Sequence, residues 1–316
     1  GDSTVSVECG ESYIDAGATA LDTCDGDLTL SIITDGTVDS NVKGLYTLTY
    51  NVSDNATNAA AEVSRTVTVG DTQPPEITLA GDDPVAVECS GLYSESGFLS
   101  VIDLCDGDMF LDMPETVTVY FWFNAELIYE AILLYGENGA EMQAGIEQIF
   151  NVNGDAGVDG EPKTPFNKQT GEYVIQYVLE DTTGNEGLAE RIVTVADTTP
   201  PLIMLVGDAE VAVECGDIYT DDGATTMDDC EGNLTPAITV VNSVNTGVVG
   251  SYAVTYSVSD GAGNAATEVT RTVNVTDTTA PVIALIGNAI ETVECGDVFA
   301  DAGATATDVC DGDITG

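Results

Sequence analysis

Histidine is absent from this chain of 316 residues, and its six lysines and arginines face 55 aspartates and glutamates. A nucleic-acid-binding surface needs clustered Lys and Arg to pair with phosphates, so this composition excludes one. The excess of negative charge also disfavours binding to anionic membranes. Nothing in the sequence favours an enzyme, because histidine, an identifiable nucleophile and a phosphate loop are all missing. Paired carboxylates, as in glycosidases, mean little where acidic residues are this abundant.

The chain also lacks an apolar run long enough to span a membrane, and no signal peptide is recognisable. Its first residue falls inside a repeat, so we expect it to be part of a longer secreted protein. The eight cysteines include no Cys-x-x-Cys pair, which together with the missing histidine disfavours a zinc site. An even number of cysteines at fixed spacing instead predicts disulfides and an extracellular environment.

The formal net charge of −49 opposes a compact fold unless cations neutralise it. Divalent ions bound at specific sites are one source of such cations. A high-salt medium is the other, and the near-absence of lysine keeps that alternative open.

All eight cysteines lie in two short pieces that recur four times. One piece is a Glu-Cys pair, and the other is an acidic loop that most often reads Asp-x-Cys-Asp-Gly-Asp. The cysteine of the loop follows the cysteine of the Glu-Cys pair by 15 or 16 residues. The first cysteine of each copy stands at position 9, 89, 215 or 295, so the period is 80 residues and the second copy holds 46 more. The internal repeat predicts four units. They are repeat 1 (1–70), repeat 2 (71–196, with an insert at about 109–170), repeat 3 (197–276) and a partial repeat 4 (277–316).

Apolar and polar residues alternate through most of each repeat, as at Val5, Val7 and Cys9. This period of two, rich in Val, Thr and Tyr and interrupted by Gly, Asp and Asn, predicts an all-β sandwich. In repeat 1 we expect further strands over 13–21, 28–33, 45–52 and 61–69. Repeat 1 lacks the strand with which repeats 2 to 4 begin. Linkers of the form Asp-Thr-x-x-Pro, stiffened by proline, should place neighbouring repeats end to end.

The insert of repeat 2 holds nine of the twenty aromatic residues, and its segments 125–134 and 139–150 are candidates for short helices. A possible contact patch for a glycan or protein partner consists of Tyr120, Phe121, Trp122 and Phe123. The alternative is that these side chains pack a local core. An exposed apolar patch on so acidic a protein predicts lateral contacts.

Several pieces of repeat 3 together resemble those of the bacterial Ig-like surface repeats, relatives of the hyalin-repeat and cadherin-like sandwiches. They are the linker 197–201, the segments 213–216 and 219–224, the acidic loop, and the segments 250–256 and 260–264. The resemblance covers everything except residues 109–170 and implies an extracellular adhesive or structural module without a reaction. Repeat 2 departs from it at Glu95-Ser96-Gly97-Phe98, where the usual sequence is Asp-Ala-Gly-Ala. Repeat 3 departs from it at Glu231 and Asn233.

The alternating direction of successive strands should bring acidic groups together at the junctions between repeats. Each junction then gathers a Glu from the repeat before it, the linker Asp, and two acidic loops of the repeat after it. Oxygen ligands without histidine favour calcium, and the arrangement resembles cadherin junctions. The alternative is that these residues only form turns and a solvated surface.

The candidate ligands of junction 1–2 are Glu8, Asp71, Asp103, Asp106, Asp108 and Asp181. Those of junction 2–3 are Glu88, Asp197, Asp228, Glu231, Asn233 and Asp260. Those of junction 3–4 are Glu214, Asp277, Asp308, Asp311 and Asp313. Unfinished sets are Asp22, Asp25, Asp27 and Asp54 in repeat 1, and Glu294 in repeat 4.

The same strand order separates the two cysteines of one repeat by a full strand, about 30 Å, which a disulfide cannot bridge. The cysteines would then pair across junctions, as Cys9 with Cys105, Cys89 with Cys230, and Cys215 with Cys310. A tight hairpin at 15–17 would instead bring Cys9 beside Cys24, so this pairing stays open. Cross-junction pairing would leave Cys24 and Cys295 without partners.

Three further sets of residues recur at fixed positions. Tyr46, Tyr173 and Tyr252 are expected to be core or corner tyrosines, and Arg65, Arg191 and Arg271 to form ion pairs on the strand surface. Asn51, Asn55, Asn233 and Asn274 begin sequons that permit glycosylation.

The favoured function is a calcium-stabilised structural or adhesive protein of the cell surface. Its subunits would assemble head to tail through the unpaired cysteines, the unfinished acidic sets and strand addition at the incomplete repeat 1. The rival explanation is that the sequence is one stretch of a longer continuous chain. Partners are then further copies of the chain, or surface proteins and glycans that bind the insert.

Overall fold

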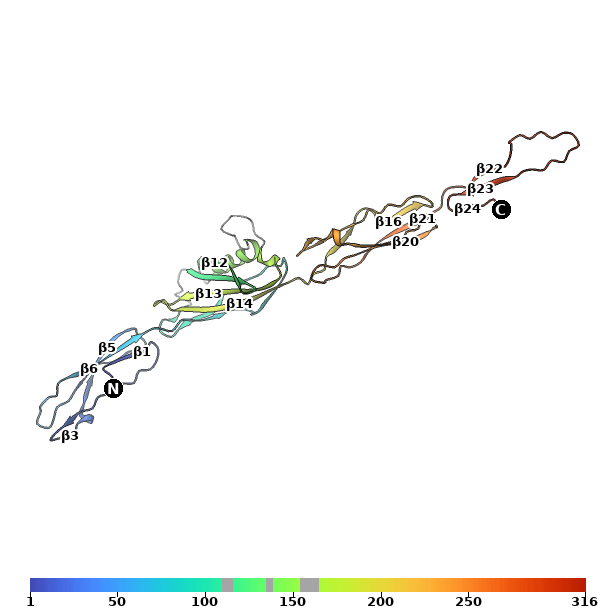
Figure 1. Cartoon of the computed structure of the whole chain (residues 1–316). Coiled ribbons are helices and arrows are strands. Elements are labelled where there is room, and N and C mark those ends of the chain that lie inside the picture. Colours follow the sequence, from blue (N-terminus) through green and yellow to red (C-terminus); the bar gives the residue numbers. More distant parts are fainter. Residues whose placement is uncertain (110–115, 135–138, 154–164) are drawn as a thin grey trace. The chain divides into compact units, whose positions relative to one another are not determined.

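The computed structural model describes residues 1–109, 116–134, 139–153 and 165–316. The chain forms two compact units, one of residues 1–87 and 91–196, the other of residues 88–90 and 197–316. Short β-strands are the main regular elements of both units, and the described part contains a single α-helix (Figure 1). The expected fold class is therefore confirmed: the chain is all-β, with tandem Ig-like or cadherin-like sandwiches and a mixed insert. The limits of the four repeats remain a prediction and serve below as labels.

In repeat 1, four strands form a sheet in the order β1-β6-β5-β4, and the short β2 and β3 form a second sheet. Leu48 and Tyr50 of β5 are buried, as are Val67 and Val69 of the neighbouring β6. The strands are β1 (Thr4–Glu8), β2 (Leu21–Asp22), β3 (Gly26–Asp27), β4 (Ile33–Asp35), β5 (Gly44–Asn51) and β6 (Val63–Gly70).

The strand expected over 13–21 is wrong except at its end, where β2 begins. The carboxylate of Asp15 accepts hydrogen bonds from the Tyr13 hydroxyl and the Gly17 amide, which folds this segment back on itself. Gly17 has a φ of 68°, which favours glycine and interrupts an extended chain. The segment 28–33 likewise contains a 3-10 turn, η1 (Thr29–Ser31), before β4 starts.

Repeat 2 has a three-stranded sheet, β10-β9-β7, and a five-stranded sheet, β12-β11-β13-β14-β8. Strand β11 of the insert pairs with β13 just as β4 pairs with β5 in repeat 1, so this part of the insert is a strand of the sandwich. The strands are β7 (Glu76–Leu79), β8 (Val85–Glu88), β9 (Phe98–Asp103), β10 (Gly107–Asp108), β11 (Thr116–Phe123), β12 (Glu126–Leu134), β13 (Gly171–Glu180) and β14 (Glu186–Ala196).

The helix expected over 125–134 is wrong, because this segment is strand β12. Asn124 and Ala125 have φ values of 48° and 67°, and two consecutive residues with positive φ form the tight turn of a β-hairpin. Strand β12 therefore folds back on β11. The second expected helix is confirmed: it is α1 (Ala140–Gln148), followed by a π-helical turn, η3 (Ile149–Asn153), and a 3-10 turn, η4 (Phe166–Lys168).

The second unit contains repeat 3, with sheets β15-β17-β18 and β16-β21-β20-β19, and the sheet β22-β23-β24 of repeat 4. Its core clusters around Ile203, Val254, Tyr256, Val258 and Val273. The elements are β15 (Leu202–Leu205), β16 (Glu210–Glu214), β17 (Ala224–Asp228), β18 (Gly232–Asn233), η5 (Thr235–Ala237), β19 (Thr239–Asn242), β20 (Gly250–Ser257), β21 (Val269–Thr276), β22 (Val282–Leu285), β23 (Ala304–Asp308) and β24 (Gly312–Asp313).

The three recurrent arginines are buried, so the expectation that they lie on the strand surface is wrong. Arg65, Arg191 and Arg271 are 4%, 1% and 1% exposed. Each forms an ion pair inside its own sandwich: Arg65 with Asp15, Arg191 with Glu95, and Arg271 with Asp221. Tyrosine hydroxyls donate to the same carboxylates, so each carboxylate is bound by an arginine and a tyrosine together.

The recurrent tyrosines are corner tyrosines, as expected. The Tyr46 hydroxyl donates to the Val42 carbonyl at 2.9 Å, and the Tyr252 hydroxyl to the Val248 carbonyl at the same distance. Tyr173 donates to the carbonyls of Phe166 and Gln169. Each bond fixes the loop that leads into β5, β13 or β20.

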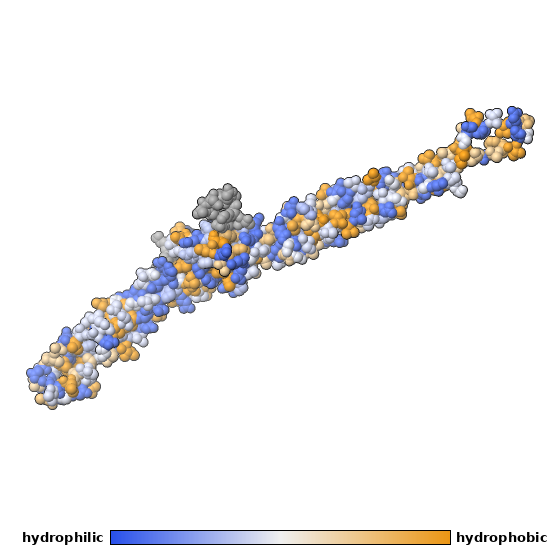
Figure 2. All heavy atoms as spheres, in the orientation of Figure 1, coloured by the Kyte–Doolittle hydropathy of each residue, from blue (hydrophilic) through white to orange (hydrophobic). Residues whose placement is uncertain are grey.

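Apolar and polar residues are mixed over the visible surface of both units (Figure 2). Large apolar side chains such as Leu30, Ile218 and Val298 are almost fully exposed. Within the described residues, no helix is long and apolar enough to cross a membrane.

Candidate cation sites at the repeat junctions

The acidic loop is shaped by its first aspartate. One carboxylate oxygen of Asp103 accepts hydrogen bonds from the amides of Cys105 and Asp106, both at 2.7 Å. Gly107, with a φ of 79°, then completes the turn into β10. The first aspartates of the other loops, Asp22, Asp228 and Asp308, make the same pair of bonds. The second oxygen of this carboxylate is left over for another partner.

A second loop follows β13 in repeat 2 and β20 in repeat 3. Asp181 accepts hydrogen bonds from the amide and the side chain of Asn185, and Asp260 accepts the same pair from Asn264. The two asparagines also donate to the carbonyls of the linker residues Asp71 and Asp197. The loop is thereby fixed against the linker that precedes its own repeat.

These loops bring Asp71, Asp103 and Asp181 together in the first unit, with one carboxylate oxygen of each within 4.8 Å of the others. Asp103 is 2% exposed and Asp181 is 7% exposed. The Oδ2 atom of Asp103 has no hydrogen-bond partner among the described residues. Burial raises the pKa of Asp71, and the charges of Asp103 and Asp181 raise it further against the lowering effect of Lys43.

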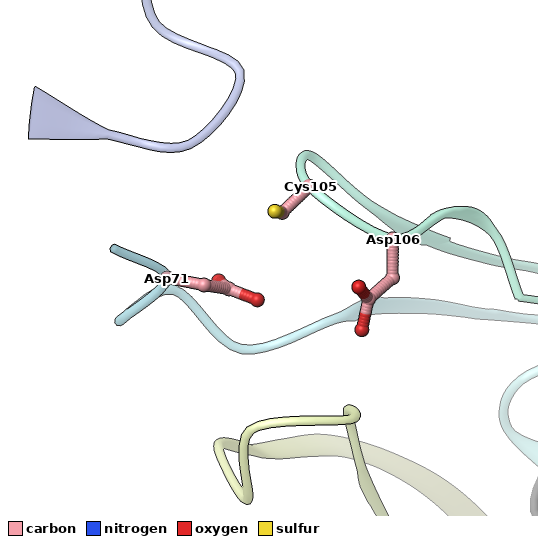
Figure 3. A group of neighbouring side chains, drawn as sticks. All are labelled: Asp71, Cys105 and Asp106. Carbon is pink, nitrogen blue, oxygen red and sulfur yellow. The ribbon is translucent and has the colours of Figure 1, made fainter. Parts of the chain in front are cut away.

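Lys43 contributes a positive charge beside this first cluster. Its Nζ atom lies 3.3 Å from Asp71 Oδ2 and 2.8 Å from Asp106 Oδ1. Asp71 and Asp106 point toward the same space, with the Cys105 sulfur near Asp71 (Figure 3). That sulfur is bonded to Cys9, so it is no free thiolate for a metal.

The second unit repeats the cluster with Asp197, Asp228 and Asp260, again within 4.8 Å. Asp228 is 4% exposed, and the Oδ2 atoms of Asp197 and Asp228 are buried without partners in the described part of the chain. Burial, followed by the charges of Asp228 and Asp260, raises the pKa of Asp197. Residues 197–316 contain one basic residue, Arg271, which already pairs with Asp221.

A third group, Asp277, Asp308 and Asp311, is more open: Asp277 and Asp311 are exposed and Asp308 is half-buried. All three clusters combine the linker aspartate with the first aspartate of the acidic loop. The first two add the aspartate of the second loop, and the third adds Asp311. All the aspartates of these three clusters are among the ligands predicted from the sequence.

Other candidate ligands have different partners. Glu8 accepts hydrogen bonds from the Thr72 amide and hydroxyl and from the Gln73 amide; the two bonds from Thr72 lower its pKa. Glu88 and Glu214 hold the threonines of the next two linkers in the same way. Each carboxylate therefore binds the linker backbone.

The remaining acidic positions lie at turns or on the surface. Asp27, Asn233 and Asp313 each accept the amide of a threonine two residues further on, as in an Asx turn. Asp25 binds Asn55, Asp54 binds Asn58, and the Gly261 amide donates to Glu231. Asp108 and Glu294 are exposed.

Three disulfides join consecutive repeats: Cys9 to Cys105, Cys89 to Cys230 and Cys215 to Cys310. This is the cross-junction alternative predicted from strand order. Cys24 and Cys295 are free and exposed. They occupy the repeat positions that form these bonds elsewhere.

The aromatic contact patch is reduced by the fold. Phe121 is fully buried and packs against Phe166, and Phe123 packs against Tyr173, so both belong to the core side of β11. Tyr120 and Trp122 lie on the other face of the strand and are partly exposed. A contact surface remains a prediction for these two.

A family profile described as "Bacterial surface protein, Ig-like domain" matches residues 1–69 and 203–275. Hyalin of Lytechinus variegatus is 31% identical over 135 residues, which are 40% of this chain and 25% of hyalin. Hyalin of Strongylocentrotus purpuratus is 33% identical over 135 residues, 40% of this chain and 11% of that protein. The chain thus spans a quarter or less of these relatives. The solved structure "Protocadherin gammaB7 EC3-6 cis-dimer" is 11% identical, with a TM-score of 0.32, over 98% of this chain and 83% of that one.

Proposed function

Because residues 1–69 and 203–275 match the profile of bacterial surface-protein Ig-like domains, we propose that the chain is a calcium-stabilised segment or subunit of a cell-surface filament or stalk. The chain is an extracellular surface module of the adhesive or structural kind, and the families that it matches are not enzymes. Calcium binding and head-to-tail assembly are the new parts of this proposal.

The observation that carries the calcium proposal is Asp228 Oδ2, a buried carboxylate oxygen without a hydrogen-bond partner among the described residues. It lies beside Asp197 and Asp260 in a unit whose single basic residue is used elsewhere. Burying a charge is costly unless the group is paired or binds a metal. A cation bound to these carboxylates removes that cost.

The donors favour calcium over other metals. All are carboxylate oxygens, and neighbouring backbone carbonyls and water can complete the about six to eight oxygens that Ca²⁺ accepts at flexible sites. Extracellular calcium modules bind with a Kd of about 0.1–1 mM. A site of this strength would be filled in a calcium-rich medium and empty in a chelator.

The test substitutes Asp228→Asn in the full chain. Asn keeps the Oδ1 atom that accepts the amides of Cys230 and Glu231, and it replaces the unpartnered oxygen with an NH2 group, which cannot bind calcium. Calcium should raise the Tm of the wild type by several degrees, since ligand at about 100 times its Kd adds about 2.7 kcal/mol. In D228N this gain should shrink, whereas in chelator D228N should melt above the wild type because one of three crowded charges is gone.

The matched control is Asp217→Asn, which removes an exposed charge from the same repeat and should leave both melting curves unchanged. The calcium proposal fails if calcium and chelator give the same Tm for the wild type and elemental analysis finds no bound calcium.

Assembly is supported by the two free cysteines. Cys24 stands where Cys105, Cys230 and Cys310 stand in later repeats, and Cys295 stands where Cys9, Cys89 and Cys215 do. A bond from Cys295 of one chain to Cys24 of the next would repeat the existing junction. Asp22, Asp25 and Asp54 accompany Cys24 as the counterparts of Asp103, Asp106 and Asp181.

A further inference from the structure

Lys43 is held by three oxygens at the first junction. Its ammonium group donates to Asp71 Oδ2 at 3.3 Å, Asp106 Oδ1 at 2.8 Å and Thr182 Oγ1 at 2.7 Å. An ammonium has three N–H donors, so its capacity is filled. The three partners come from the linker, the acidic loop and the β13–β14 loop of repeat 2. Lys43 itself comes from the loop before β5 of repeat 1, so one side chain joins all four segments.

The other repeats have no such group at this position. Lys43 precedes Gly44, which corresponds to Gly171 and Gly250; the residues before those glycines are Thr170 and Val249. The second unit has no lysine at all, because residues 88–90 and 197–316 contain only Arg271 among basic residues. The carboxylates of Asp197, Asp228 and Asp260 therefore have no positive side chain of their own unit to neutralise them.

We propose that Lys43 is a built-in cation that, bound to Asp71 and Asp106, opposes a divalent ion at the adjoining cluster of Asp71, Asp103 and Asp181. The corresponding cluster of Asp197, Asp228 and Asp260 is a divalent-ion site. The two junctions then differ in kind: the first is held by a covalently attached charge in any medium, and the second depends on the calcium concentration. This inference rests on the proposed calcium binding and adds which junction uses it.

Electrostatics gives the reason for the difference. A divalent ion at the first cluster would lie a few ångströms from the ammonium that already occupies Asp71 and Asp106, and like charges at that separation repel strongly in a partly buried site. Calcium would have to displace Lys43 from both carboxylates. We expect this to weaken binding there by about tenfold or more.

The experiment measures calcium binding to the full chain by calorimetry and equilibrium dialysis with CaCl₂ alone. Four variants are compared with the wild type. Lys43→Thr installs the residue that repeat 2 has at this position, and Lys168→Thr removes an exposed lysine as its control. Asp228→Asn and Asp103→Asn each alter one acidic cluster. Asp103→Asn keeps the oxygen that accepts the loop amides and removes the unpartnered one. It is also combined with K43T.

In the wild type, D228N should remove a calcium site, whereas D103N should leave the measured isotherm unchanged. K43T should add one site, or tighten the weakest by about tenfold, and D103N should abolish that gain. K168T should bind like the wild type. In chelator, K43T should lower the Tm, and calcium should restore it.

Three results would overturn the inference. Unchanged binding in K43T would mean that Lys43 does not compete with calcium. A site lost in D103N as readily as in D228N would mean that both junctions bind calcium alike, and the proposed function would stand without this refinement. If calcium binds neither the wild type nor K43T, both this inference and the proposed calcium binding are wrong. Binding in K43T alone, removed by D103N, supports the role of Lys43 and contradicts the calcium site at the second junction.

Discussion

At the scale of single residues, the buried arginines show how a chain with so few basic groups uses them. In repeat 2, Arg191 and Glu95 are 1% and 5% exposed, and their side chains meet at 3.2 Å. Glu95 also accepts hydrogen bonds from the hydroxyls of Tyr93 and Tyr177. The departure of repeat 2 from Asp-Ala-Gly-Ala is thus a substitution in the same role, since Glu95 meets Arg191 as Asp15 meets Arg65 and Asp221 meets Arg271.

Replacing Glu95 with Gln should therefore destabilise repeat 2. Breaking one partner of a buried ion pair leaves the other charge uncompensated and typically costs about 3–5 kcal/mol. Trp122 lies in the same repeat and is the only tryptophan, so its fluorescence during urea unfolding reports on this repeat. The control is Glu190→Gln on an exposed part of β14, which should change the free energy of unfolding by less than about 0.5 kcal/mol. An equally small effect of E95Q would contradict a structural role for the pair.

The raised pKa of Asp197 predicts how calcium stabilisation depends on pH. Burial and the neighbouring Asp228 and Asp260 make this carboxyl bind its proton more tightly in the folded state than in the unfolded state. Its protonation therefore stabilises the metal-free fold, and that contribution is lost as pH rises through its folded pKa. Calcium binds the ionised form only. The Tm difference between calcium and calcium-free buffer should be largest near about pH 7 and shrink toward about pH 4; a difference that does not change with pH would contradict ionised carboxylates as the ligands.

At the scale of strands and loops, the sequence predicts best what depends on chain direction. Alternating strands put the Glu-Cys pair and the acidic loop at opposite ends of a repeat, which is why Cys9 pairs with Cys105 and why Asp71 meets Asp103. Neither result needs knowledge of side-chain packing. The period of two in β5 and β20 likewise identifies the buried residues Leu48 and Val254.

The sequence does not predict features that depend on the backbone conformation of one or two residues. The hairpin between β11 and β12 turns on Asn124 and Ala125, a pair without the glycine that usually marks such a turn. The burial of Arg65 could have been predicted, because alternate residues of a strand face the same side and Arg65 alternates along β6 with the apolar Val67 and Val69. Lys43 had none: its three partners lie in three separate segments of repeat 2, and only the folded chain brings them together.

At the scale of the whole chain, the disulfides and the acidic clusters belong to the same joints. Cys105 and Cys230 each lie two residues after the buried aspartate of a cluster, Asp103 or Asp228. The bonds close loops with sequence separations of 96, 141 and 95 residues. In the chain-entropy description, a loop of about 100 residues is worth about 4.7 kcal/mol. Each joint therefore combines a covalent bond between repeats with a cluster of carboxylates.

Head-to-tail assembly should extend this joint from one chain to the next through Cys295 and Cys24. In a thiol-disulfide buffer with millimolar calcium, the wild type should form a ladder of oligomers, and digestion without reductant should release a peptide that joins the two cysteines. Cys24→Ser or Cys295→Ser alone should stay monomeric, because each lacks one half of the joint. Equal amounts of the two variants mixed together should stop at dimers, since one chain offers only Cys295 and the other only Cys24. Dimers of either variant alone would indicate unspecific oxidation of exposed thiols, and a wild type that stays monomeric would contradict assembly through these residues.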